Sequence, residues 1–471
     1  MTTGTTIGTA TGTGDPGRDA GGVTAPAVAS RRAVFGLAVP ALGVLAAEPL
    51  YVLVDTAVVG HLGAVSLGAL GIGGALLSQV AVQFNFLAYG TTSRAARWYG
   101  AGQRDAAVNE GVQASWFALA LGLLVLAAGE LLAGPATRLL AGGTGEVQAA
   151  AEAWLRIALL GAPFILLSVA GNGWMRGVRE TRRPLAYALA ANLVSAVLNP
   201  LLVYPAGLGL AGSAIANVTA QAFGGVLFVR ALASAGVPLR PHPAVMRAQL
   251  RLARDLVVRT LGMQACFLAA AGVAARMGTA QIAAHQIALQ LWVFLALVLD
   301  AFAIAAQALV GGALGGGDAA LAHRIAWRVA RYGAATGAAF AVGLLAGWYA
   351  VPALFTADPD VLAQAHLAWP WFAAMQPAAG VVFALDGVLI GAGDVPFLRT
   401  LTVGAGLLGF LPMTLVAYAA GLGLGGVWAG LTLFVLIRLV GMVLRTRHGA
   451  WAVTGADLDA SRSRQRSLRR S

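Results

Sequence analysis

The chain has 471 residues, of which 59% are hydrophobic and 11% are charged, and its mean hydropathy is +0.78. Soluble domains carry about 25% charged residues, so this composition excludes an ordinary soluble enzyme and indicates a protein that crosses a membrane many times. The formal net charge is +12, with arginine as the basic residue. Most arginines lie in short connections or tails, so we interpret the charge as a topology signal and expect no nucleic-acid partner.

Residues 1–30 are rich in Gly, Thr and Ala, and we expect them to form a disordered cytoplasmic tail. We expect no cleavable signal peptide, because the first apolar segment is too long for one. The single cysteine, Cys266, lies in an apolar segment. This pattern favours neither a disulfide framework nor a metal cluster, and we expect no metal site and no cofactor.

The first apolar segment, residues 33–59, contains two acids and two prolines. Glu48 and Asp55 are seven residues apart, so they project from nearly the same face of a helix. A charge at bilayer depth costs at least about 2.5 kcal/mol, so both acids should face a bundle interior or a wet cavity. Since burial favours a neutral carboxyl and hydration a charged one, Asp55 is a candidate proton-binding group. Pro40 and Pro49 allow the helix to bend. The alternative is a buried acid that a neighbouring amide satisfies.

Twelve apolar segments are long enough to cross a bilayer, for which about 20 helical residues suffice. They are residues 33–59, 66–92, 112–134, 149–175, 184–205, 209–235, 250–276, 280–312, 325–354, 361–391, 396–420 and 423–446. Arginines gather after the even-numbered segments, as in the run from Arg230 to Arg259 after the sixth. By the positive-inside rule, these connections and both termini are cytoplasmic, which predicts a multi-pass protein of the inner (cytoplasmic) membrane.

The second segment, residues 66–92, carries the polar residues Gln79, Gln83 and Asn85. Together with aromatic residues such as Tyr51, they would suit a bulky, partly apolar cation. We therefore name these four as candidate residues of a substrate cavity. Aromatic rings in membrane helices are more often simple packing, so a structural role stays open.

The fifth segment carries a single polar stripe. Asn192, Ser195 and Asn199 fall at positions i, i+3 and i+7, on one face of a helix. Such a stripe can hydrogen-bond to Asp55 or hold helices together. Polar bonds between membrane helices average about 0.6 kcal/mol, so both roles stay open.

In the second half of the chain, Asp300 lies in the eighth segment and Asp386 in the tenth. We interpret both as second-choice cation or substrate contacts, with structural roles equally open. His285 can titrate near neutral pH, although a lone histidine near a helix start is more often structural. The position that matches Asp55 in this half is Ala270, so the two halves are chemically unequal.

Four sequence patterns recur 213 to 215 residues apart. They are GHLGAVSLGAL at 60–70 with ARMGTAQIAAH at 275–285, AGQRDAA at 101–107 with LGGGDAA at 314–320, NGWMRGVRE at 172–180 with DGVLIGAGD at 386–394, and GLGLAG at 207–212 with GLGLGG at 421–426. Because six spans is an even number, both halves enter the membrane from the same side and form parallel repeats.

We therefore expect an all-α integral membrane protein with twelve helices in two six-helix lobes, related by a pseudo-two-fold axis along the membrane normal. The expected parts are an N-lobe at 31–235, a cytoplasmic inter-lobe loop at 236–249, a C-lobe at 250–446 and a basic cytoplasmic tail at 447–471. Two such lobes with a cavity between them form the architecture of a rocking transporter.

Three strings carry a resemblance to a known family: AEPLYVLVDTAVVGHLGAVSLGALGI at 47–72, FNFLAYGTTSRAARWYGAG at 84–102 and IAAHQIALQLWVFLALVLDAFAIAAQALVGG at 282–312. The chain resembles the multidrug and toxic compound extrusion (MATE) transporters, and within them the branch named for DNA-damage-inducible membrane proteins. The resemblance covers about residues 31 to 450.

The resemblance implies roles for particular residues. A proline and an aspartate fifteen residues apart in the first helix take part in cation-driven bending of that helix, and Pro40 and Asp55 keep this spacing. The polar network of the N-lobe in relatives maps onto Asn172, Ser195, Asn199 and Asn217. Some relatives carry a second aspartate where this chain has Asn199, and an amide takes up no proton in the physiological range. An N-lobe proton would then rest on Asp55 or Glu48.

The expected function is a secondary antiporter that exports small organic compounds, cationic or amphipathic, in exchange for H⁺ or Na⁺, and that acts as a monomer in the bilayer. A lipid-linked precursor flippase of the same wider superfamily is the alternative. It would favour a strongly cationic central cavity, whereas the arginines here lie nearly all at the rims. We expect no enzyme, because the six histidines are scattered without catalytic spacing. The Gly-rich strings lack the strand-to-helix context of a nucleotide site.

Overall fold

The computed structural model describes residues 30–458 and 460–461, whose regular secondary structure is helical. The helices are α2 (Arg31–Gly60), α3 (Ala64–Phe84), α4 (Phe86–Gly100), α5 (Arg104–Ala141), α6 (Glu146–Leu159), α7 (Ala162–Gly177), α8 (Arg182–Val203), α9 (Gly209–Ala233), α10 (Pro243–Met277), α11 (Thr279–Gly315), α12 (Ala319–Ala346), α13 (Ala350–Ala353), α14 (Pro359–Gly391), α15 (Val395–Ala405), the π-helix η1 (Gly406–Phe410), α16 (Leu411–Ala419) and α17 (Gly423–His448). The expected tail at 1–30 lies, except for Ser30, outside the described residues.

Within the described residues, eleven helices or unbroken runs of helix are long and apolar enough to cross a membrane. Helices α6 and α7 pass the same test together and are bent by 51° at a short break, so they count as a twelfth span. The predicted fold class, an all-α membrane protein with twelve spans, is confirmed.

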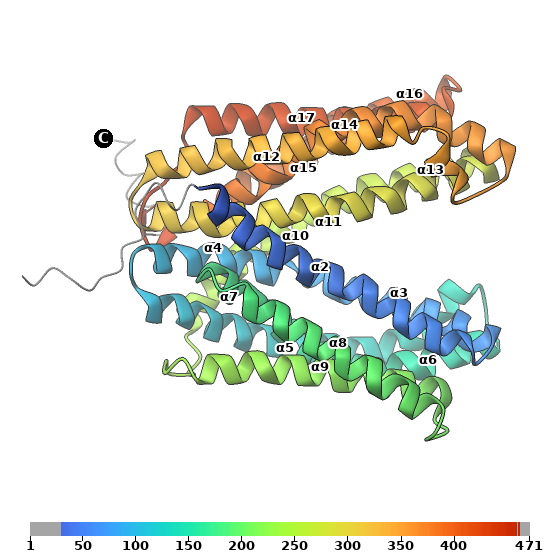
Figure 1. The fold of residues 1–471 in the computed structure, drawn as a ribbon, viewed down its shortest axis with the longest axis horizontal. Helices are drawn as coiled ribbons and strands as arrows, with labels where there is room; N and C mark the ends of the chain where they lie inside the picture. Colours follow the sequence, from blue (N-terminus) through green and yellow to red (C-terminus); the bar gives the residue numbers. More distant parts are fainter. Residues whose placement is uncertain (1–29, 459, 462–471) are drawn as a thin grey trace, which may run out of the picture.

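Figure 1 shows two helical bundles that lie side by side. We call α2–α9 the N-lobe and α10–α17 the C-lobe. The elements of the two lobes follow each other in the same order, as the sequence repeats predict. The lobes differ where α3 gives way to α4 at Asn85, since the corresponding α11 runs unbroken past Asp300.

Helix α2 connects both lobes. Its N-cap Ser30 accepts a hydrogen bond from the backbone N–H of Ala33 at 3.1 Å. One turn later, Phe35 packs on two aromatic rings of the C-lobe, Phe302 at 5.8 Å and Tyr332 at 5.4 Å between ring centroids. The rest of α2 runs diagonally to the N-lobe (Figure 1). A single helix thus touches the C-lobe at its start and carries Asp55 into the N-lobe near its end.

Arginines gather at one end of the molecule, which we call the arginine-rich end and which lies at the left of Figure 1. It holds the end of α4, the start of α5, the end of α7 and the starts of α8, α12 and α15, with Arg94, Arg97, Arg104, Arg176, Arg179, Arg182, Arg183, Arg324, Arg328, Arg331 and Arg399. Both ends of the described chain lie there, and the two lobes draw apart toward the opposite end (Figure 1).

At the arginine-rich end, glycines bring α4 and α11 into backbone contact across the lobes. A Cβ atom on Gly100 would overlap the backbone of Gly312, and one on Gly315 would overlap the backbone of Arg97. Side chains of ordinary size would hold the two helix axes farther apart. The lobes therefore close tightly at this end.

The segment that follows α17 covers this closure. The guanidinium of Arg97 is fully buried and donates to the carbonyl oxygens of Val453 at 3.0 Å, Gly455 at 2.8 Å and Ala392 at 3.0 Å. The N–H of Gly455 donates to the carbonyl of Leu314 at the end of α11 at 2.9 Å. The first residues of the predicted basic tail therefore link α4 of the N-lobe to the C-lobe.

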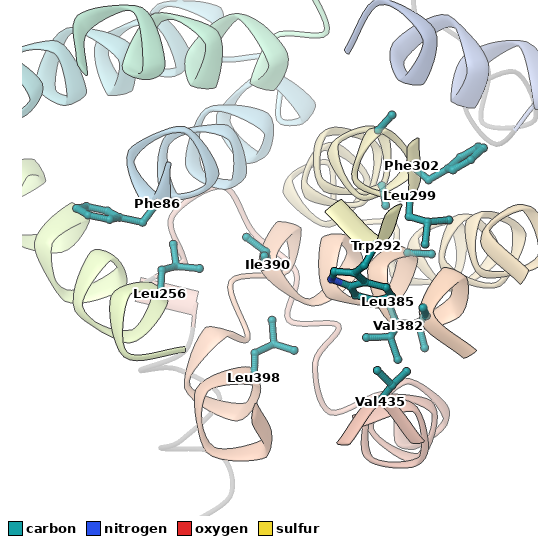
Figure 2. Packing of buried hydrophobic residues seen from close by; sticks show 14 of the residues in the cluster. Phe86, Leu256, Trp292, Leu299, Phe302, Val382, Leu385, Ile390, Leu398 and Val435 are labelled. Atoms are coloured by element: carbon teal, nitrogen blue, oxygen red, sulfur yellow. The ribbon is translucent and has the colours of Figure 1, made fainter. Parts of the chain in front are cut away.

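The C-lobe core is built on α14, which is flanked by α11, α12 and α17. Glycines again allow close packing: a Cβ on Gly333 of α12 would overlap the backbone of Gly380 in α14. Figure 2 shows Trp292 of α11 pointing toward Val382 and Leu385 of α14, with Val435 of α17 nearby. This lobe is a dense apolar core, so the polar groups inside it stand out.

Candidate functional site

Asp55 accepts three hydrogen bonds inside the N-lobe, although only 4% of it is exposed. Asn199 Nδ2 donates to its Oδ1 at 2.6 Å, and Ser213 Oγ donates to the same oxygen at 2.7 Å. The Tyr51 hydroxyl donates to Oδ2 at 3.5 Å and itself accepts from Asn217 Nδ2 at 2.7 Å. Helices α2, α8 and α9 thus place one carboxylate among neutral donors, which stabilises its charged form without a cation.

The polar stripe of α8 faces α2 along its length. Asn192 Nδ2 donates to the carbonyl of Ala47 at 2.7 Å, whereas Asn199 donates to Asp55. Ser195 lies buried between them. The stripe therefore combines both of the roles left open by the sequence, since one amide holds the helices together and the other binds the carboxylate.

Sequence analysis missed two residues of this network. Ser213 binds Asp55 directly, and Trp154 Nε1 donates to Ser213 Oγ at 3.3 Å. Ser213 stands four residues before Asn217, on the same face of α9, and that spacing could have revealed it. Nothing in the sequence around Trp154 distinguishes it from a packing residue, because its partner comes from another helix.

A cavity of about 740 Å³ opens beside this network, entirely within the N-lobe. Its polar lining comprises Glu48, Tyr51, Asp55, Thr56, Ser78, Ser168, Asn172, Tyr187, Asn192, Asn217 and Gln221, and most of the remaining lining is aliphatic. Glu48 is exposed, whereas Asp55 is buried and still forms part of the cavity wall. Two acids on a mostly apolar wall suit an organic compound with a positive charge or a polar end.

The structure places several predicted cavity residues elsewhere. Gln79 does not line this cavity, whereas the adjacent Ser78 does. Gln83 donates to Gln264 of the C-lobe at 2.5 Å, so it bridges the lobes. Asn85 stands at the break between α3 and α4. Gln79 and Gln83 both lie in α3, before this break.

The C-lobe candidates lie apart from the Asp55 network. Asp300 accepts from the hydroxyl of Tyr89 at 3.2 and 3.4 Å, at the contact between α11 and α4. Asp386 forms ion pairs with two arginines of its own lobe. His285 is fully buried and its ring lies 5.7 Å from that of Trp428. None of these three side chains lines the N-lobe cavity.

Pro40 and Pro49 both lie inside α2, which continues unbroken through them. Pro40 is half-buried and Pro49 is exposed. Each proline removes one backbone N–H from the helix ladder, so α2 holds two weak points on the N-terminal side of Asp55. A role for them in bending stays a prediction.

Two arginine positions, Arg259 and Arg438, differ from the expectation that arginines lie at the rims. Arg259 was counted in the arginine run after the sixth segment, although it falls within the predicted seventh segment, 250–276; it lies inside α10 and is 6% exposed. It pairs with Asp386, as does Arg438 in α17 at 3.3 Å. Helix α10 starts at Pro243, so Arg259 is more than four turns into the helix.

Comparison with known proteins gives consistent matches. The sequence model of the MatE family matches residues 40–201 and 256–415. Protein DETOXIFICATION 44, chloroplastic, of Arabidopsis thaliana is 35% identical over 436 residues, which cover 89% of this chain and 83% of the relative. DNA damage-inducible protein F of Escherichia coli (strain K12) is 31% identical over 90% of this chain and 94% of its own length.

A solved structure described as MATE in the bent conformation has a TM-score of 0.81 at 20% identity, covering 93% of this chain and 98% of that one. At this level of identity the likeness concerns the fold alone. The two-lobe arrangement described above is therefore shared with that structure.

Proposed function

Since this chain belongs to the MatE family of membrane transporters, we propose that it is a secondary active antiporter that exports organic compounds across the cytoplasmic membrane in exchange for H⁺ or Na⁺. One observation carries the proposal: Asp55, a buried carboxylate held by neutral donors, lies at the wall of the N-lobe cavity. A coupling ion and a substrate can therefore act on the same group.

The chemistry of coupling follows from the hydrogen bonds of Asp55. As a carboxylate it accepts from Asn199, Ser213 and Tyr51. A protonated carboxyl must donate one bond, so at least one of these three donors has to turn away or pair elsewhere. The three donors come from α8, α9 and α2 itself. Protonation therefore rearranges the hydrogen bonds that join Asp55 to Tyr51 and to α8 and α9, and such a change can bias two lobe arrangements.

The substrate class follows from the cavity wall. Glu48 and Asp55 supply negative charge, and the apolar remainder of the lining suits a cationic or amphipathic compound. This acidic wall disfavours the phosphate groups of a lipid-linked precursor, so we place the flippase second. The family consists of transporters rather than enzymes. We further propose that one chain suffices, because each element of the cavity comes from a single N-lobe.

The test is transport by the purified protein in proteoliposomes. A fluorescent organic cation, ethidium, is loaded outside and a pH gradient or a Na⁺ gradient is imposed in separate arms. We expect ethidium uptake into vesicles when the gradient drives the coupling ion outward, and none after the gradient is collapsed with an ionophore. Equal ethidium movement with and without either gradient would contradict the antiport proposal.

The arginine-rich end is proposed to face the cytoplasm, by the positive-inside rule. We expect a tag at the N-terminus and a label in the loop 236–249 to be unreachable from outside intact cells. A label at Asp358, which caps the exposed start of α14 at the opposite end, should be reachable. If residues 236–249 are labelled from outside intact cells, the arginine-rich end faces outward and the proposed orientation is wrong.

A further inference from the structure

The C-lobe contains a buried charge cluster that the Asp55 site does not use. It consists of Arg259 in α10, Asp386 in α14 and Arg438 in α17, which are 6%, 6% and 3% exposed. Arg259 contacts Oδ2 of Asp386, and Arg438 Nη2 lies 3.3 Å from Oδ1. Two guanidinium groups therefore share one carboxylate.

This cluster lies well inside the membrane-spanning part of the lobe. Arg438 stands ten residues before the end of α17, which corresponds to about 15 Å along the helix. The neighbouring Asp300 has Arg176 and Arg259 within Coulombic range and is hydrogen-bonded by Tyr89. Among the described residues, three arginines thus accompany two acids, and one positive charge is left without a counterion. A buried charge of this kind is costly unless something pairs with it.

The donors of Arg438 are only partly used. Within the described part of the chain, its Nε has no hydrogen-bond acceptor, its Nη2 has only the ion pair with Asp386 at 3.3 Å, and its Nη1 reaches only the Met263 sulfur at 3.9 Å. Its guanidinium carbon lies 5.5 Å from the ring centre of Phe434. A side chain that is 97% buried thus keeps its Nε free for a ligand, while Asp386 is the one acid that holds its Nη2 among the described residues.

Arg438 lines a small cavity. Its volume is about 20 Å³, enough for one water-sized group. The lining comes only from the C-lobe: Met263, Phe267, Trp292, Met375, Ala379, Val382, Phe383, Leu431, Phe434, Val435 and Arg438. Figure 2 shows Trp292, Val382 and Val435 around this part of the lobe. Arg438 is therefore the one charged group among these aromatic and aliphatic lining residues.

The pocket is the repeat counterpart of the N-lobe cavity. Helices α10, α11, α14 and α17 line it, and they correspond to α2, α3, α7 and α9, which line the N-lobe cavity. The N-lobe wall carries Glu48 and Asp55, whereas the C-lobe wall carries Arg438. The two lobes thus offer opposite charges at corresponding cavities, although on helices that do not correspond, since the acids lie on α2 and Arg438 lies on α17.

We propose that the C-lobe pocket is an anion site, in which Arg438 binds a monovalent anionic group, chiefly the carboxylate of an exported organic compound. One carboxylate oxygen fits the volume of the pocket and can accept from the free Nε, and the second oxygen competes with Asp386 for Nη2 in the side-on geometry that arginine offers. The aromatic lining takes the apolar body of such a compound when the pocket opens toward the space between the lobes. As a statement about substrates, this inference rests on the proposed export function. The other source of a monovalent anion is free chloride.

The test measures binding to purified full-length protein in HEPES buffer without chloride and without any ion gradient. Benzoate, its neutral isostere benzamide, and sodium chloride are titrated separately by calorimetry. We expect benzoate to bind at least about tenfold more tightly than benzamide, the factor that a charge-assisted hydrogen bond provides. Chloride binding with no benzoate preference would assign the site to the free anion.

Variants decide whether Arg438 is responsible. Arg438→Gln should remove the preference for benzoate over benzamide, and Arg438→Lys should keep part of it. Asp386→Asn should strengthen benzoate binding, because it removes the carboxylate that competes for both arginines. Arg324→Gln, an arginine of the same lobe that is 57% exposed, is the matched control and should change nothing.

A purely structural role for Arg438 would give a different pattern. Arg438→Gln would then lower the melting temperature and leave the ratio of benzoate to benzamide affinity as in the wild type, which overturns the proposal. Equal binding of all three ligands by the wild type overturns it as well. If Arg438→Gln fails to fold, the opposite shifts expected of Arg438→Lys and Asp386→Asn still decide. Because no gradient is used, failure of ion-coupled export leaves this test intact.

Discussion

Asp55→Asn is expected to abolish gradient-driven export while the protein still folds. The amide has nearly the shape of the carboxyl group, and its oxygen can accept the bonds that Asn199 and Ser213 now donate to Oδ1. Its NH₂ group would face the Tyr51 hydroxyl, which can accept. Removing a buried charge also removes its desolvation cost. We therefore expect expression and melting temperature to hold or rise slightly.

Export fails because the amide cannot alternate between a charged and a neutral form. The free-energy difference that would couple the ion gradient to the lobe arrangement then disappears. The measurement is gradient-driven ethidium uptake in proteoliposomes. We expect the uptake rate of the variant to fall to that of vesicles without protein. Wild-type rates in a folded Asp55→Asn protein would refute Asp55 as the coupling group.

Glu48→Gln is the matched control on the same cavity wall. Glu48 is exposed and is not part of the hydrogen-bond network of Asp55, so its loss should slow export without abolishing it. The double variant should be inactive. If Glu48→Gln proves as severe as Asp55→Asn, the coupling ion is shared between both acids.

The fold could be predicted because its signals are local or repeated. Apolar length identifies a span within one segment, and the recurrence of whole patterns reveals the two halves without knowledge of any contact. The pairing of Asp55 with Asn199 could be predicted for the same reason. The spacing of Asn192, Ser195 and Asn199 defines one helix face, and a polar face in a membrane helix must meet another polar group.

The rest of the site depends on contacts between distant segments. Arg259, Asp386 and Arg438 come from three helices, and no spacing within any of them shows that two arginines meet one acid. Charge counting along the sequence even assigned Arg259 to the run of arginines after the sixth segment. A membrane-buried arginine is recognised only when its helix is known to extend past the arginine into the lobe, as α10 does.

Gly315→Ala is expected to open the arginine-rich end. The added Cβ would overlap the backbone of Arg97, which cannot move aside as a flexible side chain would. Overpacking of this kind costs about 1–3 kcal/mol. The cost falls only on the arrangement in which α4 and α11 touch, so the alternative arrangement gains about 5- to 150-fold in relative population.

The measurement uses a cysteine reporter at the closed contact. Ser93 of α4 is 1% exposed and its backbone lies beside Gly311 of α11, so Ser93→Cys in a Cys266→Ala background should resist a membrane-impermeant maleimide. Adding Gly315→Ala should make it reactive and slow export. Gly343→Ala, at a glycine of α12 whose Cβ would meet no atom within 4 Å, is the control and should leave labelling unchanged. A cysteine at position 93 that stays protected in the Gly315→Ala variant would show that contact between these two glycine-lined helices does not keep the arginine-rich end closed.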